Sequence, residues 1–236
     1  MVTSAEANAK KRRILIIAVS IFIVVAVVVA MVPLLMNLFM GNGVKTEGIE
    51  SKEVSAASTA IDGEWQVTNR PGSNSTSAGF TFDEVLPGER RTTSASTQGV
   101  TGFAKVVDGT LTAGEITVDM QHLTSDSDVR DESVRQRIFH TAEYPEATFR
   151  VTEPADVSAV PDDGSVGSVE LTGDLTIHGT TQPVTQRFDV ARSGDRLIVA
   201  GDIPISRLDY GVETPELVAA KIAEDGEVNV RVNLAK

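Results

Sequence analysis

Apolar and polar residues alternate along much of the chain from Ile61 to Lys236. In residues 227–234, EVNVRVNL, every second position is valine or leucine and the positions between them are polar. A period of two is typical of β-strands that bury one face and expose the other to water. The same period recurs in three further segments, residues 115–121, 147–153 and 168–179.

Shorter apolar runs predict the rest of the sheet. The dipeptide Asp108-Gly109 between two such runs is a strong signal for a tight β-hairpin. Ser193-Gly194-Asp195 and Asp225-Gly226 have the residue types of further turns. We therefore expect additional strands at residues 64–68, 78–85, 102–107, 184–191 and 196–205.

One segment has a helical pattern instead. Val134 and Ile138 lie four positions apart, and Asp131 is placed to pair with Arg135 on the same helix face. Polar residues at 125–127 are suitable N-caps. We expect a helix over residues 128–138, and a second short helix near residues 215–221, where Pro215 would suit the first turn.

Many antiparallel strands around a short helix favour one fold class. The class is mainly β, because a sheet of this size must hide its edges and closure into a barrel does so. Barrels of about eight strands can enclose a small ligand, as lipocalins do. We expect an antiparallel, lipocalin-like β-barrel over residues 61–236, with one or two short helices.

The N-terminal part has the composition of a membrane anchor. Residues 10–13 are all basic, and residues 14–32 contain Ser20 as their sole polar side chain. A run of that length spans roughly 28 Å as a helix, close to the thickness of a hydrocarbon core. We predict a transmembrane helix at 14–40, through which the membrane is a partner of the chain. The alternative, a cleaved signal peptide, would have a shorter apolar region and a site of small residues after it.

The charge distribution sets the orientation of that anchor. Basic residues stay on the cytoplasmic side, so residues 1–13 are predicted to be cytoplasmic and the C-terminal domain extracytoplasmic. Residues 41–60 are small and polar, which predicts a flexible linker. The expected location is thus a single-pass protein of the cell membrane.

Composition excludes several functions. The chain has no cysteine, so it has no disulfide framework, thiol nucleophile or cysteine metal ligand. Its net charge is −12, and an acidic protein repels phosphate backbones, so nucleic acid is not an expected partner. The three histidines, His122, His140 and His178, lack metal-ligand spacing, and no metal is predicted. The sequence has no P-loop, dinucleotide fingerprint or nucleophile elbow, so neither a cofactor nor catalysis is expected.

Several motifs occur in an order that resembles the YceI-like family. The clearest is GDLTIHG at 173–179, followed by Pro183-Val184-Thr185. Others are Trp65 in GEWQV, VDM at 118–120, RD at 130–131, IFH at 138–140, YP at 144–145, and ISR at 205–207 with DYG at 209–211. The family usually has a His-Leu pair after its Arg-Asp, where this chain has Ser133-Val134 nearby.

The resemblance implies an antiparallel barrel around an apolar cavity that binds a polyisoprenoid lipid, with no catalytic residues. Periodicity alone leaves open a barrel whose core is solid, because both arrangements need the same inward apolar face. The candidate lipid-binding residues are Phe80, Phe82, Val118, Met120, Phe149, Val151, Leu175, Ile177, Phe188, Val190, Ile203 and Ile205.

Four polar residues complete the candidate site. Arg130, Asp131, Asp209 and Tyr210 either bind a lipid headgroup or fix the helix to the barrel. The expected function is a membrane-anchored module that binds an isoprenoid-type lipid. The alternative is a protein-interaction module of the cell envelope with a solid barrel core, and an enzyme acting on a lipid-linked substrate is a third hypothesis. A homodimer is compatible with the sequence.

Overall fold

The structure, a computed structural model, describes residues 16–17, 19–28, 31, 41–86, 89–214 and 221–236. The chain divides into two units, Met1–Gly41 and Asn42–Lys236. The described residues between 16 and 31 are helical. Among the residues described, no helix has the length and hydropathy needed to cross a membrane. Much of the predicted transmembrane segment 14–40 falls outside the described residues, and that segment stays a prediction.

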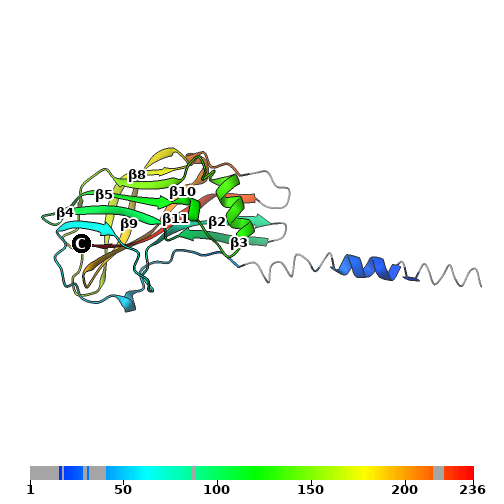
Figure 1. Ribbon diagram of the computed structural model, residues 1–236, viewed down its shortest axis with the longest axis horizontal. Helices are drawn as coiled ribbons and strands as arrows, with labels where there is room; N and C mark the ends of the chain where they lie inside the picture. The colour runs from blue at the N-terminus through cyan, green and yellow to red at the C-terminus, as the bar shows by residue number, and fades with distance from the viewer. Residues whose placement is uncertain (1–15, 18, 29–30, 32–40, 87–88, 215–220) are drawn as a thin grey trace, which may run out of the picture. The chain divides into compact units, whose positions relative to one another are not determined.

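In the second unit, the described residues contain eleven strands of one antiparallel sheet (Figure 1). The strands are β1 (Gly63–Val67), β2 (Ser77–Leu86), β3 (Glu89–Thr97), β4 (Val100–Val107), β5 (Thr110–Asp119), β6 (Glu146–Val151), β7 (Ala155–Asp156), β8 (Val166–Ile177), β9 (Thr180–Ser193), β10 (Arg196–Ser206) and β11 (Lys221–Ala235). The short helices are η1 (Ser51–Glu53), η2 (Met120–His122), α2 (Asp128–Ser133), η3 (Val134–Ile138) and η4 (Arg207–Tyr210).

Eight of these strands close into a barrel. The order of hydrogen-bonded neighbours is β1-β4-β5-β6-β8-β9-β10-β11, and β11 pairs with β1 to complete the ring. Strand β11 is long enough to have two neighbours on its other edge: Lys221 to Arg231 pair with β2, and Leu234 and Ala235 with β1. Strand β3 extends the sheet from β2. The predicted β-barrel is therefore confirmed.

The nine strands predicted from the sequence are all present, and two further strands were missed. Strand β3, ERRTTSAST, is almost entirely polar, so it has no apolar period to reveal it. It forms because its backbone pairs with β2 along its whole length. The predicted turn at Asp225-Gly226 is wrong, because both residues lie inside β11 at a β-bulge opposite Phe82.

The predicted helix at 128–138 is present as α2 followed by a π-helical turn, η3. Ser127 caps it by accepting a hydrogen bond from the Arg130 amide. The helical segment lies at one end of the barrel (Figure 1) and buries Val134 against the core. Residues 215–220 of the second predicted helix lie outside the described residues, and Lys221 begins β11.

The predicted flexible linker at 41–60 differs from the structure. Residues 42–60 run along the barrel, and the compact unit begins at Asn42 rather than Ile61. Backbone hydrogen bonds join Val44 to Ser94 and Ser58 to Gly194. Small polar side chains suit this position because they let the backbone approach the sheet and satisfy its hydrogen bonds. Composition alone therefore gave the wrong expectation for these residues.

This N-terminal segment also buries the outer face of β11. The period of two predicts that Asn229, Arg231 and Asn233 face water, yet both asparagines are 0 % exposed. Arg231 donates hydrogen bonds from Nη1 to the carbonyls of Glu47 and Gly48, at 3.2 and 3.1 Å. The polar side chains thus lie in a buried hydrogen-bonded layer that the sequence pattern did not reveal.

Candidate functional site

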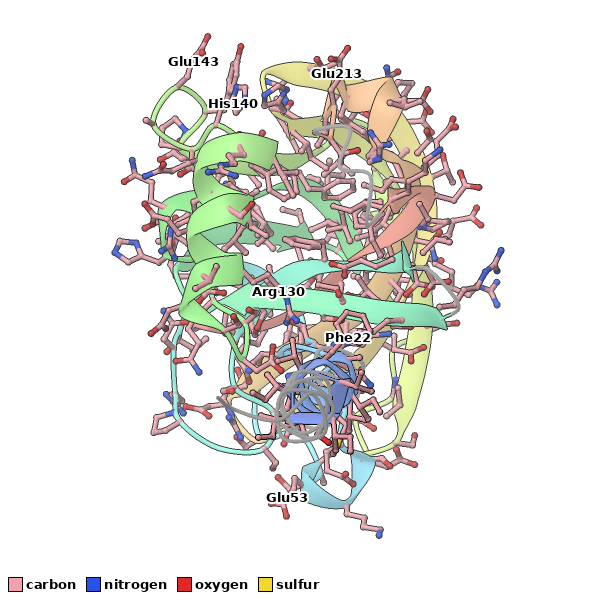
Figure 2. All side chains as sticks on the ribbon, turned by 90° about the vertical axis from the view of Figure 1, so that its right-hand side faces the viewer. Phe22, Glu53, Arg130, His140, Glu143 and Glu213 are labelled. Atoms are coloured by element: carbon pink, nitrogen blue, oxygen red, sulfur yellow. The ribbon has the colours of Figure 1, made fainter. Side chains whose placement is uncertain are left out.

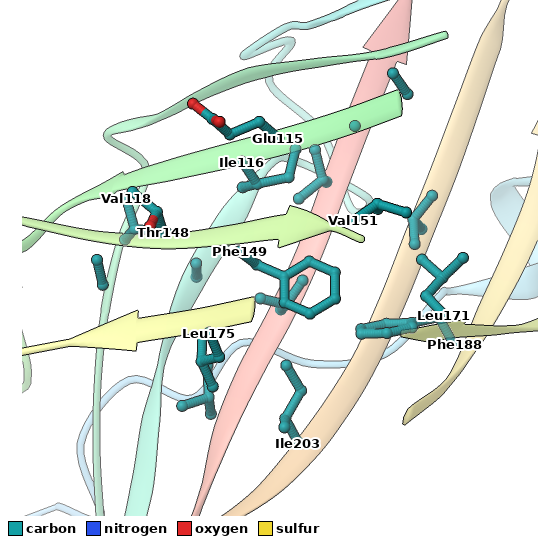
Figure 3. Close-up of a pocket in the computed structure, with 18 of the residues that line it drawn as sticks. Glu115, Ile116, Val118, Thr148, Phe149, Val151, Leu171, Leu175, Phe188 and Ile203 are labelled. Carbon is teal, nitrogen blue, oxygen red and sulfur yellow. The ribbon is translucent and has the colours of Figure 1, made fainter. Parts of the chain in front are cut away.

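The barrel interior contains an apolar cavity of ≈ 170 Å³. Two groups of buried side chains surround it, one towards the α2 end and one around Trp65. Figure 3 shows the Phe149 and Phe188 rings projecting into the interior, with Leu175 and Ile203 beside them. The ring centroids of Phe149 and Phe188 are 6.0 Å apart. The interior is therefore not completely filled, which argues against the solid core of the alternative hypothesis.

All twelve residues predicted to face a ligand line this cavity. They lie on strands β2, β5, β6, β8, β9 and β10 or, for Met120, on η2 directly after β5. Their position follows from strand geometry, because alternate residues of a closed sheet point to its inside. Sequence reasoning missed the lining residues that loops and helices supply, such as Leu123, Phe139, Val157 and Val160, because these segments have no strand period.

The lining is almost entirely apolar. Of the 36 described residues around the cavity, Glu115 and Thr148 alone have polar side chains. Both alternate with inward residues of β5 and β6, and Glu115 pairs across the ladder with Arg150. A cavity of this kind offers no nucleophile or acid–base pair, and it can hold a ligand mainly by excluding it from water.

Buried side chains gather at both ends of the barrel. At one end Trp65, 1 % exposed, packs with Val157 and Val160 from the connection before β8. At the other end Phe139, after the helix, and Tyr210, in η4, pack into the core. The described residues thus place buried apolar side chains at both ends of the barrel.

Arg130 and Asp131 do not line the cavity. Arg130 forms an ion pair with Asp126 on the same turn, and Figure 2 shows it at one end of the helical segment with His140 at the other. Burial raises the pKa of Asp126, but the Arg130 charge and several hydrogen bonds outweigh it and hold that pKa below its ordinary value. Asp131 is 5 % exposed and accepts hydrogen bonds from the amide and hydroxyl of Ser125, at 2.7 and 2.6 Å.

Asp209 and Tyr210 lie in η4 at the same end of the barrel as α2. The Asp209 carbonyl accepts a hydrogen bond from Gln182 Nε2 at 2.9 Å. Burial, and then the nearby Asp209 carboxylate, raise the pKa of Tyr210 to about 12. Arg130 and Asp131 thus contact residues of their own segment, 125–131, whereas the Asp209 carbonyl joins η4 to β9. A headgroup role for the four polar candidates stays a prediction.

His140 and His178 come close together, although they lie far apart in the sequence. Their ring centroids are 5.4 Å apart, and Tyr144 packs against His178 at 4.3 Å. His178 and Gly179 both have positive φ, 51° and 73°, and form the two-residue turn between β8 and β9. Within the described residues no three potential metal ligands cluster.

This barrel is similar to known proteins. A family model described as the YceI-like domain matches residues 52–234. The chain belongs to this family. Protein YceI of Escherichia coli O6:H1 is 34% identical over 104 residues, which cover 40% of this chain and 50% of that protein. The chain thus spans about half the length of the curated relatives that it matches.

Two solved structures share the fold of this YceI-like domain. One is a polyisoprenoid binding domain from Saccharophagus degradans implicated in plant cell wall breakdown, with a TM-score of 0.54 and 18% identity, covering 73% of this chain and 97% of that one. The other is BcnA of Burkholderia cenocepacia, with a TM-score of 0.52 and 20% identity, covering 66% and 96%. At these identities the likeness shows the fold.

Proposed function

We propose that this protein binds an apolar, isoprenoid-type lipid inside its barrel and is held to the membrane by residues 14–40. The observation that carries the proposal is the cavity of ≈ 170 Å³, with two polar side chains among the 36 lining residues that the structure describes. The similarity of fold to a domain described as polyisoprenoid binding supports the choice of ligand.

The energetics suit a hydrocarbon chain without a dominant polar contact. Each methylene group moved from water into the cavity contributes about 0.8 kcal/mol. A polar ligand would lose hydrogen bonds to water there and find almost no replacements, at a cost of about 2–7 kcal/mol per group. Selectivity for apolar chains therefore comes from the lining itself.

The size of the cavity limits how much of a ligand it holds in this conformation. An apolar cavity of about 150 Å³ is large enough to bind benzene, so ≈ 170 Å³ holds a short part of a polyisoprenoid. A longer chain requires the surrounding side chains to move apart. The flexible side chain of Met120 and the aromatic rings along the cavity are suited to such repacking.

The membrane location is supported by the sequence. Residues 14–32 are long and apolar enough to cross a bilayer, and residues 10–13 would keep the N-terminus in the cytoplasm. The barrel would then lie outside the cytoplasm, where it could exchange lipid with the outer leaflet. Cysteine labelling of the naturally cysteine-free chain tests this. Labelling of Ser4→Cys but not of Asp163→Cys by an impermeant reagent on intact cells would contradict the orientation.

The ligand is tested by extraction and by titration. The full chain is purified, extracted with organic solvent and analysed by mass spectrometry, where we expect an isoprenoid lipid. Trp65, the sole tryptophan, reports binding of dansyl-labelled geranylgeraniol by energy transfer. Absence of both a copurified lipid and a saturable transfer signal would refute the function. We propose a binding role without catalysis, because the described lining of the cavity is apolar apart from Glu115 and Thr148.

A further inference from the structure

The barrel wall has a weak place between β9 and β10. The ladder that joins them covers five residue pairs, from Arg196 opposite Ser193 to Ala200 opposite Asp189. The two neighbouring ladders are longer, with twelve residue pairs between β8 and β9 and eleven between β10 and β11, whereas β6 and β8 are joined by four pairs and β1 and β11 by two. Residues 180–188 of β9 and 201–206 of β10, all described, are therefore not joined by a backbone ladder.

The sequence explains why pairing stops there. Pro183 lies in β9 and Pro204 in β10, both within the unpaired parts. Proline has no N–H to donate, so a sheet tolerates it where the strand edge is unpaired. Gly201 stands at the first position after the ladder, and an added Cβ there would lie 2.8 Å from the Phe188 ring. The ring thus lies against the backbone at the point where the strands separate.

A hollow on the outside of the barrel reaches this place. Its rim includes the outward residues Arg187, Asp189 and Asp202, and its floor includes Gly201 and Val230 from the inward positions of β10 and β11. Val230 also lines the interior cavity. Val230 therefore borders both the hollow and the cavity, and Phe188, which lines the cavity, lies beside Gly201 of the hollow.

We propose that the unpaired seam between residues 180–188 and 201–206 is a lateral portal through which the lipid enters and leaves, with Phe188 as the side chain that closes it. The inference rests on the proposed function. It follows from two observations together: buried apolar side chains lie at both ends of the barrel, and the two long strands β9 and β10 share a ladder of five residue pairs, beyond which their residues 180–188 and 201–206 are not paired with each other. Opening the seam breaks no ladder bond, and it widens a cavity that is short for a polyisoprenoid.

The test closes the seam covalently. If the ladder register continued, Asp202 would stand opposite Arg187. The double variant Arg187→Cys/Asp202→Cys is made in the full chain, which has no other cysteine, and is reconstituted in liposomes. The thiols are joined as a disulfide, or with a short bismaleimide where the disulfide does not form, and mass spectrometry confirms the link. Stopped-flow energy transfer from Trp65 follows uptake of dansyl-labelled geranylgeraniol.

A matched link across a paired ladder is the control. Thr176 and Thr181 are opposite each other in β8 and β9 with their hydroxyl oxygens 2.8 Å apart, and both are replaced by cysteine and linked in the same way. We expect the seam link to slow uptake and release at least tenfold and the control link to change them less than twofold, with cleavage of the disulfide restoring the rate.

Two results separate the possible failures. Unchanged rates with a linked seam, or equal slowing by the control, overturn the portal while leaving lipid binding intact. Loss of equilibrium binding in the unlinked wild-type chain instead overturns the proposed function. As a second variant, Phe188→Ala should speed probe release at least threefold relative to Phe80→Ala, which removes a similar cavity-lining ring from β2, where it packs with Phe82 and Phe139. Equal release rates would also count against the portal.

Discussion

Filling the cavity should make the protein more stable and a poorer lipid binder at the same time. At roughly 24 cal/mol per Å³, an empty volume of ≈ 170 Å³ corresponds to about 4 kcal/mol of stability relative to a filled core. Ala147 lines this cavity from β6. The substitution Ala147→Leu adds about three buried CH₂ equivalents, worth roughly 2 kcal/mol of unfolding free energy if the new side chain enters empty space.

The same atoms should displace the ligand. Losing about three CH₂ contacts from the lipid weakens binding by about 2.4 kcal/mol, a Kd increase of roughly 50-fold. Urea unfolding measures the stability, and energy transfer from Trp65 to dansyl-labelled geranylgeraniol measures the Kd. The matched control is Ala113→Leu, which makes the same change on β5 at a position paired with the exposed Lys105 and outside the cavity lining.

The opposite pattern would refute this reasoning. A destabilised Ala147→Leu variant that binds the probe as tightly as the wild type would show that the space is already filled, or that the ligand binds elsewhere. Overpacking typically costs about 1–3 kcal/mol, so the sign of the stability change decides between empty and occupied space. Ala113→Leu should leave the Kd unchanged.

Three further predictions concern the polar framework around the barrel. Replacing the buried Asp131 by alanine should lower the unfolding free energy by about 1.5–3 kcal/mol without changing the Kd of the probe. The control Asp128→Ala, at an exposed position of the same helix turn, should have little effect on either quantity. A raised Kd for Asp131→Ala alone would favour a headgroup role. Tyr210 keeps its proton more tightly when folded, because its pKa is raised from 10.0 to about 12. The contribution of Tyr210 to stability is complete below pH 10 and should decline by about 2–3 kcal/mol as the pH rises to 12. Urea unfolding at both pH values should show a smaller decline in unfolding free energy for Tyr210→Phe than for the wild type. Replacing Arg231 by lysine removes the guanidinium that donates to the carbonyls of Ser75, Glu47 and Gly48; limited proteolysis should then cut near residues 42–50 at least fivefold faster, and an unchanged rate would contradict the anchoring role of Arg231.

The local pattern of the chain was sufficient for most of the barrel wall. Each predicted strand contains its own alternation of apolar and polar residues, and the tight turns at Asp108-Gly109 and His178-Gly179 rest on residues that tolerate positive φ. The inward residues of those strands follow from parity, which is why all twelve predicted lining residues face the cavity.

Features that depend on distant contacts were not predictable in this way. Strand β3 has polar side chains and exists because β2 pairs with it. Residues 42–60 have the composition of a linker, but their backbone hydrogen bonds go to partners such as Ser94 and Gly194, which are remote in the sequence. No local pattern shows that such partners will be near.

The amino-acid sequence by itself determined that this protein is an antiparallel barrel of the YceI-like family, which side chains point inward, and that its reactive chemistry is sparse. Tertiary structure alone decided that the interior retains a cavity, which segments outside the strands line it, and that the ladder between β9 and β10 ends after five residue pairs. The physical reason is that periodicity reports the direction of a side chain, whereas the space left between opposing side chains depends on how the curved sheet closes. A filled barrel and a hollow one can share the same alternation of residues.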